Sequence, residues 1–244
     1  IYGTRYCMSI YLSASSIKDF ISCSKKVEYR YKKPFPEVVS KGMLLGKITH
    51  YILETGWQDR DLANKILDGQ ASKHKLLKAD RTNLSFYIDM FFLNFQPYLK
   101  DTDMIEHKFK IPLHDDVFLV GTMDRISNGN IYDWKTTSRV SKSLSNDIQC
   151  IVYDFAYRSL FNKTASGMCI GWLPKGQLIP FVRDELYYRE VFSNIIPRMI
   201  KTIKADNFER TGMFNHSCFW CQYREGCLGN RKIFTGDAHE LDSQ

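Results

Sequence analysis

The sequence contains no apolar run of about 18 residues, which is the length that a helix needs to cross a lipid bilayer. Its N-terminus lacks the basic-then-apolar pattern of a secretory signal. Internal repeats, low-complexity tracts and clear linkers are also missing. We therefore expect a single domain over residues 1–244 that is soluble, intracellular and cytoplasmic, and that has no membrane partner.

A phosphate-binding loop is missing as well, although the segment 42–49 resembles one. Its two glycines stand one residue too close together, and Ile48 occupies the position where such a loop needs a hydroxyl group. The sequence therefore excludes a nucleotide-driven motor, such as a helicase or another ATPase.

The hydrophobic content allows a sizeable core, and the positive net charge favours a polyanionic partner. Of the 244 residues, 44% are hydrophobic and 14% aromatic, which is enough to build one large domain. The net charge of +7 favours binding to nucleic acid. A charge of this size is also common on proteins that never contact nucleic acid, so it supports such a function without identifying it.

The spacing of apolar residues predicts helices in the N-terminal half, strands in the centre and a mixture towards the C-terminus. Serines that can cap a helix, followed by apolar residues at helical spacing, predict a first helix ending near Pro34. The other expected elements are helix over 62–99, strands over 104–111, 117–126 and 130–135, helix over 145–161, strands over 168–173 and 178–188, and helix over 195–203. The predicted class is mixed α/β (α+β), with a mainly helical part (13–100), an αβ core (101–190) and a cysteine-rich segment (205–235).

Two carboxylates and a lysine lie close together in the central strands. Asp124 lies near the end of one predicted strand, the turn Asn128-Gly129-Asn130 follows, and Asp133 lies on the next strand. The two carboxylates are therefore expected side by side, and Lys135 projects to the same face as Asp133. Two acidic oxygen ligands suit Mg²⁺ or Mn²⁺. A hairpin with solvated charges would explain these residues equally well if they stood alone.

Further polar residues flank this pair in the sequence. His50 and Glu54 share one face of a predicted helix, beside an apolar stripe. Glu106 is a lone acid on the first of the central strands, and Gln149 and Tyr153 are four residues apart on the following helix. An amphipathic helix with a polar edge would also account for the last two.

Five motifs thus follow one another across residues 46–153: G-x-x-x-H-x-x-L-E, a lone Glu, G-x-x-D, D-x-K and Q-x-x-x-Y. Each is weak alone, but in this order they resemble the RecB-like branch of the PD-(D/E)XK nuclease superfamily. The resemblance implies a restriction-endonuclease-like core, a central mixed sheet flanked by helices, with a helical N-terminal part and a C-terminal cysteine-rich metal clasp. It further implies a phosphodiester hydrolase of the Mg²⁺- or Mn²⁺-dependent deoxyribonuclease type. We expect an exonuclease that acts on single-stranded DNA or duplex ends, with protein partners in recombination, repair or CRISPR adaptation.

The resemblance also implies roles for the residues at these motif positions. His50, Asp124, Asp133 and the backbone carbonyl of Trp134 would hold the divalent cation, and Glu106 would reach it directly or through water. The other catalytic residues would be Lys135, which steadies the nucleophile or the developing oxyanion, and Gln149 and Tyr153, which position the nucleic acid or the metal-site groups.

Three of the seven cysteines stand together as C-x2-C-x5-C, at Cys218, Cys221 and Cys227, within reach of one metal centre. In iron-sulfur relatives of the RecB-like branch, the AddB nuclease domain and the Cas nuclease of CRISPR spacer acquisition, one early and three late cysteines hold a [4Fe-4S] cluster. Cys23 stands at the early position. The alternative is a structural zinc site completed by His216. Disulfides are less expected, because the count is odd and no secretion signal is present.

A second hypothesis is a non-catalytic nucleic-acid-binding or scaffold subunit built on the same fold. The presence of Asp124, Asp133 and Lys135 together favours the enzyme, because a protein that only binds nucleic acid has no need of that trio.

Overall fold

The computed structural model describes residues 9–35, 39–141, 144–212 and 214–229. It divides into two compact units: Ile1–Ala14 with Val39–Asn194, and Ser15–Val38 with Ile195–Gln244. The predicted helical part 13–100 is therefore distributed over both, because Cys23 belongs to the second unit and His50 to the first. In the part of the chain described here, no helix is long and apolar enough to span a membrane.

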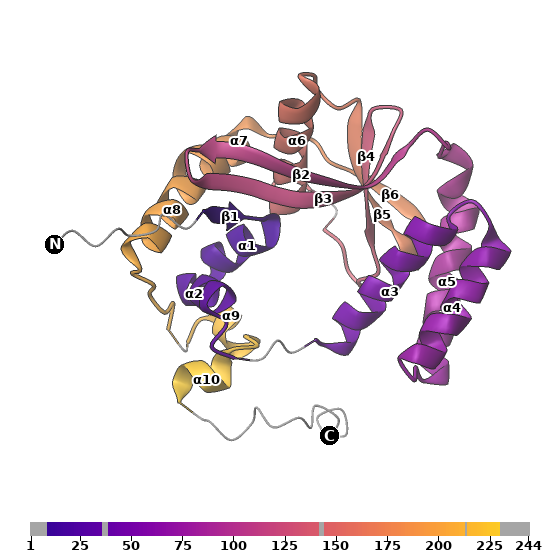
Figure 1. The fold of residues 1–244 in the computed structure, drawn as a ribbon, viewed down its shortest axis with the longest axis horizontal. Coiled ribbons are helices and arrows are strands. Elements are labelled where there is room, and N and C mark those ends of the chain that lie inside the picture. Colours follow the sequence, from indigo (N-terminus) through magenta and orange to yellow (C-terminus); the bar gives the residue numbers. More distant parts are fainter. Residues whose placement is uncertain (1–8, 36–38, 142–143, 213, 230–244) are drawn as a thin grey trace. The chain divides into compact units, whose positions relative to one another are not determined.

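The first unit is built on a mixed sheet of six strands (Figure 1). Its strand order is β1-β3-β4-β5-β6, with β2 paired to β3. The strands are β1 (Ile10–Leu12), β2 (Met104–His114), β3 (Val117–Ser127), β4 (Asn130–Lys135), β5 (Gly167–Trp172) and β6 (Gln177–Pro180). β2, β3 and β4 pair antiparallel, and for β3 and β4 this agrees with the turn predicted at Asn128-Gly129-Asn130, whereas β4–β5 and β1–β3 are parallel. The mixed α/β class with a central sheet and flanking helices is confirmed.

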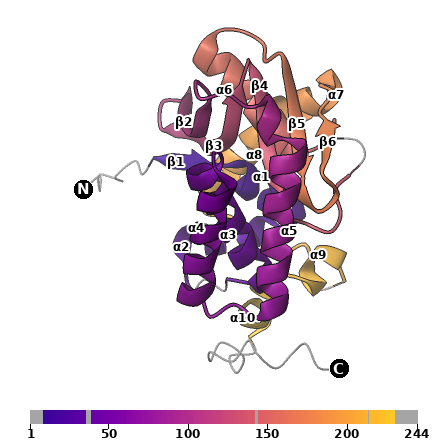
Figure 2. The same ribbon diagram turned by 90° about the vertical axis from the view of Figure 1, so that its right-hand side faces the viewer.

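Three helices of the first unit pack on one another: α3 (Lys41–Gly56), α4 (Arg60–Lys73) and α5 (Lys78–Asn94) (Figure 2). The helix predicted over 62–99 is thus two helices and a short 3-10 turn, and Asp59 begins α4 by accepting hydrogen bonds from its first N–H groups. Apolar residues of all three helices form one buried cluster, Ile48, Ile52, Ala63, Leu67, Leu84 and Ile88. This packing fixes α3 against its neighbours.

The two faces of β4 are covered by different helices. Trp134 packs in a cluster with Leu53 and Phe91 of α3 and α5, with Trp57 and Phe95, which directly follow these helices, and with Leu173. Asp133 and Lys135 alternate with Trp134 and so face the other way, where α6 (Ile148–Phe161) supplies Gln149. The end of β4 is therefore reached by side chains from both sides of the sheet.

The second unit contains α1 (Ala14–Ser22), α2 (Ser24–Lys32), α8 (Ile196–Ala205), α9 (His216–Phe219) and α10 (Arg224–Leu228). The single helix predicted up to Pro34 is wrong, because the chain is extended at Cys23, which stands as the cap residue between α1 and α2. Apolar residues recur at helical spacing on both sides of Cys23, so their periodicity did not reveal the break between the two helices.

The strand predicted over 178–188 is also wrong beyond Pro180. β6 ends there, and α7 (Glu185–Arg189) begins after Asp184, whose side chain accepts a hydrogen bond from the Leu186 N–H. Asp184 followed by Glu185 is a helix-start signal that outweighed the local alternation of apolar residues.

Candidate active site

Three potential metal ligands converge where α3, β2 and β3 meet in the first unit. His50, Glu106 and Asp124 each offer one ligand atom, and these atoms lie within 4.8 Å of one another. The His50 Nδ1 atom lies 3.4 Å from Asp124 Oδ1 and 4.0 Å from Glu106 Oε1. The side chain of Glu54 lines the same small cavity. The donor set of one imidazole and two carboxylates suits a hard divalent cation.

Glu106 adopts an unusual backbone conformation at this point. Its φ angle is +47°, in the left-handed region that non-glycine residues rarely occupy. Ile105 and His107, on either side of it, pair with Arg125 and Met123 of β3. Strained residues of this kind cost about 1–3 kcal/mol and cluster at functional sites.

A second group of side chains surrounds Asp133, which is only 1% exposed. Its Oδ1 atom accepts a hydrogen bond from Gln149 Nε2 at 2.8 Å, and its Oδ2 atom lies 2.6 Å from Lys135 Nζ. Lys135 Nζ also donates to Gln149 Oε1 at 2.9 Å. The Tyr153 hydroxyl accepts from Gln149 Nε2 and donates to the Thr122 carbonyl of β3 at 2.5 Å. The structure thus brings four sequence-predicted side chains into one network.

The two groups meet through β4. The Trp134 N–H donates a 2.7 Å hydrogen bond to Asp124 Oδ2, so Asp124 and Asp133 lie beside each other on neighbouring strands. Asp133 is nevertheless not among the three closest ligand atoms, because its oxygens face Lys135 and Gln149. Trp134 contributes its N–H here, and the role of its carbonyl as a metal ligand stays a prediction.

The site holds more negative charge than its own cations neutralise. Burial disfavours the imidazolium of His50, but a hydrogen bond to Asp124 and the charges of Asp124 and Asp133 outweigh it and raise the pKa of His50 to about 9. Burial and the charge of Asp124 raise the pKa of Glu106 to about 7. The same two causes raise the pKa of Asp133 to about 6, against the opposing charge of Lys135. A divalent cation would relieve this repulsion.

Two contributors to the site were assigned no role from the sequence. The Thr122 carbonyl anchors the Tyr153 hydroxyl, and Glu54 lines the cavity beside His50. Glu54 had a sequence signal, because it is four residues after His50 on the same helical face. Thr122 had none, since its contribution is a backbone atom.

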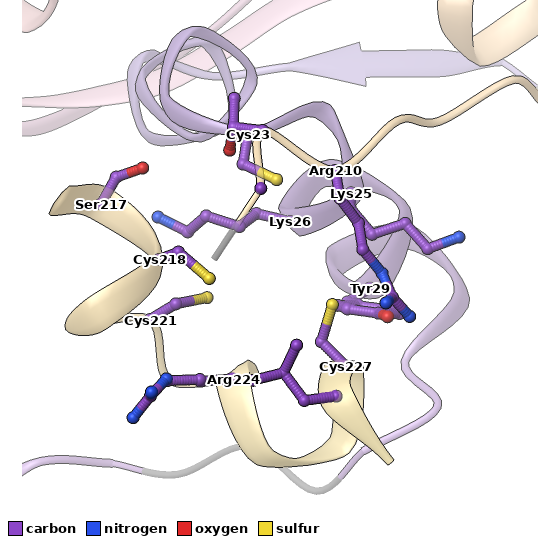
Figure 3. Close-up of a pocket in the computed structure, with 13 residues that line it drawn as sticks. Cys23, Lys25, Lys26, Tyr29, Arg210, Ser217, Cys218, Cys221, Arg224 and Cys227 are labelled. Carbon is purple, nitrogen blue, oxygen red and sulfur yellow. The ribbon is translucent and has the colours of Figure 1, made fainter. Parts of the chain in front are cut away.

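The four predicted cluster cysteines line one cavity in the second unit, and their sulfur atoms point into it (Figure 3). They are Cys23, Cys218, Cys221 and Cys227, and Lys25, Lys26, Arg210 and Arg224 line the same cavity. Burial acts to raise the pKa of Cys23, but hydrogen bonds from Thr211 and backbone groups of α2 outweigh it and lower that pKa. His216 does not line the cavity, although Ser217 does.

The early and late segments of the second unit are joined by hydrogen bonds beside this cavity. The Lys25 N–H donates to the Glu209 carbonyl at 3.2 Å, and the Glu209 N–H donates to Ser24 Oγ at 2.8 Å. Ser217 Oγ and Thr211 Oγ1 both donate to the Ser22 carbonyl at 3.2 Å. These bonds bring Cys23 to the C-terminal cysteines across almost two hundred residues of sequence.

Comparison with known proteins identifies the fold. A sequence model of the PD-(D/E)XK nuclease superfamily matches residues 11–228. Comparison with curated proteins found no match. A crystal structure from Eubacterium rectale, of a protein named "Putative exonuclease", is similar with a TM-score of 0.63 and 16% identity, over 88% of this chain and 87% of that one. At this identity the likeness concerns the fold alone.

Proposed function

This chain belongs to the PD-(D/E)XK nuclease superfamily, and we propose that it is a Mg²⁺- or Mn²⁺-dependent deoxyribonuclease of the RecB-like branch. Its proposed substrate is single-stranded DNA or duplex ends, cleaved as an exonuclease in recombination, repair or CRISPR adaptation. The observation that carries the proposal is the convergence of His50, Glu106 and Asp124 within 4.8 Å, next to a buried Asp133 paired with Lys135.

The residues present fit a hard divalent cation. Three donors of the preferred types already lie within 4.8 Å of one another. Asp133 Oδ2 is buried and has no hydrogen bond of regular geometry, although Lys135 Nζ lies 2.6 Å from it. The pKa values of Glu106 and Asp133 are raised first by burial and then by the charge of Asp124, which is the expected result when acidic ligands are gathered in one partly buried site.

Each side chain of the site has a distinct proposed role. When bound, the cation would polarise the scissile phosphate and lower the pKa of a water molecule. His50, Glu106, Asp124, Asp133 and the Trp134 carbonyl would hold it. Lys135 would place its ammonium group beside the reacting phosphate and stabilise negative charge there. Gln149 would fix both Asp133 and Lys135, since it bonds to each, and Tyr153 would fix Gln149 against β3.

A cleavage assay with variants tests this proposal. Lys135→Ala should reduce kcat by about 10²–10³-fold on end-labelled DNA with Mn²⁺, the usual effect of removing one charge-stabilising donor. Lys65→Ala, on the exposed side of α4, is the matched control and should cut at the wild-type rate. EDTA should stop the reaction. Wild-type turnover by folded Lys135→Ala would contradict the assignment, and salt-sensitive DNA binding without any cleavage would favour the non-catalytic scaffold.

We also propose that the four cysteines of the second unit hold a [4Fe-4S] cluster. Thiolates around one zinc ion at about 2.3 Å lie within about 4 Å of one another. Among the residues that the structure describes, His50, Glu106 and Asp124 form the one group of three or more potential ligands whose donor atoms all lie within 4.8 Å of one another. No three of the four cysteine sulfur atoms are therefore that close together. Ligands of a cluster bind separate iron atoms and lie further apart, which supports the cluster over zinc.

The position of His216 outside the cavity lining lends no support to the alternative zinc site. Iron and zinc analysis of anaerobically purified protein, with an absorbance spectrum, tests the choice. Iron with a brown chromophore supports the cluster. One zinc per chain without iron would contradict it.

A further inference from the structure

Arg125 follows Asp124 directly on β3, and its side chain is almost fully buried, with 2% exposed. Its guanidinium makes three contacts in different directions. The carbon atom Cζ lies 3.7 Å above the centre of the Trp57 ring, Nε donates to Asp103 Oδ2 at 2.9 Å, and Nη2 donates to the Lys100 carbonyl at 3.0 Å. Arg125 also lines the cavity of the three potential metal ligands.

The contact with Trp57 constrains the helix that carries His50. Trp57 directly follows α3 and is seven residues beyond His50, which is about two helical turns, so both lie on one side of the helix. Trp57 is 7% exposed and belongs to the cluster that packs α3 and α5 against Trp134. A guanidinium stacked on this ring fixes the end of α3 relative to β3.

The contacts with Asp103 and Lys100 constrain the strand that carries Glu106. Asp103 directly precedes β2, three residues before Glu106, and its side chain is 2% exposed. Asp103 Oδ2 also accepts a hydrogen bond from the Lys100 N–H at 2.8 Å, so the turn itself is closed. Glu106 has a positive φ angle, and its neighbours Ile105 and His107 are the residues that pair with β3. The path of the chain into Glu106 therefore depends on this anchored turn.

A buried ion pair is a poor way to gain stability, because the cost of removing two charges from water offsets their attraction. Apolar residues of similar volume often serve the fold as well or better. An arginine is distinguished by its planar guanidinium, which stacks on a ring and donates hydrogen bonds in its own plane at the same time. Arg125 uses both properties, each towards a different element of the site.

We infer that Arg125 is a positioning residue for the metal site, which sets the mutual distances of His50, Glu106 and Asp124 by joining α3, the turn before β2, and β3. This inference rests on the proposed metal site and deepens it. Outer contacts that orient metal ligands typically contribute 10–100-fold to metal affinity.

The test measures Mn²⁺ binding by electron paramagnetic resonance, at equal concentrations of folded protein determined by circular dichroism. Arg125→Met combined with Asp103→Asn removes both charges together, so that no buried charge is left alone. We expect the Kd for Mn²⁺ to rise about 10–100-fold and the spectrum of bound Mn²⁺ to change. Excess Mn²⁺ should restore much of the lost cleavage, since the defect lies in holding the ligands together.

Two further variants separate positioning from folding. Trp57→Leu leaves the ion pair intact but removes the ring, and should weaken Mn²⁺ binding in the same direction, whereas Trp57→Phe keeps a ring and should restore it. The matched control is Arg183→Met. Arg183 also pairs with a buried carboxylate, Asp154, and lies 3.8 Å above the ring of Tyr188, and Asp154 keeps Arg158 as a partner. The control should bind Mn²⁺ within about twofold of wild type.

The outcomes distinguish this inference from the proposed function. If wild-type protein binds Mn²⁺ and His50→Ala weakens that binding, the metal site stands. If the folded Arg125→Met, Asp103→Asn variant then binds Mn²⁺ like wild type with an unchanged spectrum, the positioning role is overturned. If wild-type protein binds no Mn²⁺, or if His50→Ala changes nothing, the metal site itself is wrong and the inference fails with it.

Discussion

Asp133→Asn should abolish cleavage and yet stabilise the metal-free protein. The proposed enzyme needs a carboxylate here, but without the cation that carboxylate is buried, 1% exposed, and next to Asp124. Asparagine has nearly the same shape and keeps an oxygen that can accept the hydrogen bond from Gln149 Nε2. The substitution therefore removes the charge while keeping most of the packing.

The magnitude follows from the raised pKa. The pKa of Asp133 is shifted from 3.8 to about 6, first by burial and then by the charge of Asp124. At roughly 1.36 kcal/mol per unit, the ionised group lowers the free energy of unfolding by about 3 kcal/mol at pH 7. The new amide nitrogen faces Lys135 Nζ, a second donor, which costs about 1–2 kcal/mol. We expect a net gain of about 1–2 kcal/mol, or a Tm higher by a few degrees.

The stability difference between Asp133→Asn and wild type should depend on pH. Between the unfolded pKa near 3.8 and the folded pKa near 6, folded protein binds more protons at Asp133 than unfolded protein does. Wild-type stability therefore falls as pH rises through this window, and the cost is complete above it. The advantage of Asp133→Asn should be present at pH 7 and absent at about pH 4.

Thermal and urea unfolding in EDTA measure this difference. Asp68→Asn is the control, because Asp68 is 58% exposed and its loss should change stability by less than about 0.5 kcal/mol. Added Mn²⁺ should raise the Tm of wild type more than that of Asp133→Asn, since the variant lacks one of the proposed ligands. An Asp133→Asn protein that is less stable than wild type at pH 7 in EDTA would refute the reasoning.

Three other predictions concern the proton balance, nucleic-acid binding and the cysteine cavity. The pKa of His50 is raised to about 9 and that of Glu106 to about 7 in the metal-free protein, so Mn²⁺ binding at pH 7 should release protons. The affinity for Mn²⁺ should therefore rise with pH up to about pH 9. Calorimetry in two buffers would detect the released protons, and an affinity that does not change with pH would contradict the prediction. Asp124→Asn should lose cleavage but still bind DNA, with affinity falling steeply as salt rises; a flat salt dependence in a binding titration would argue against electrostatic contacts. The Cys23→Ser variant should lose iron, the brown chromophore and some thermal stability. The control is Cys169→Ser, which replaces a half-buried cysteine of β5 and should keep the iron. Equal iron content in both variants would exclude Cys23 as a ligand.

The sequence by itself determined the elements whose signals are local. The strands around Asp124 and Asp133 follow from alternation and from the turn Asn128-Gly129-Asn130, and the structure confirms β3 and β4 over nearly the predicted residues. The D-x-K spacing placed Lys135 on the face of Asp133, where their side chains lie 2.6 Å apart. A four-residue helical spacing likewise brought Gln149 to Tyr153. In each case a few neighbouring residues fix the geometry.

Only the tertiary structure decided which acids join His50. Glu106 and Asp124 do so because β2 and β3 pair in a particular register, whereas Asp133 is held by Lys135 and Gln149. The break at Cys23 depends on hydrogen bonds from residues near Glu209, far along the chain.

The contact of Arg125 with Trp57 also joins elements that are distant in sequence. Local spacing specifies which face a side chain occupies, but the partner on that face is set by long-range packing and strand register. Those are properties of the whole chain, so no short stretch of sequence contains them.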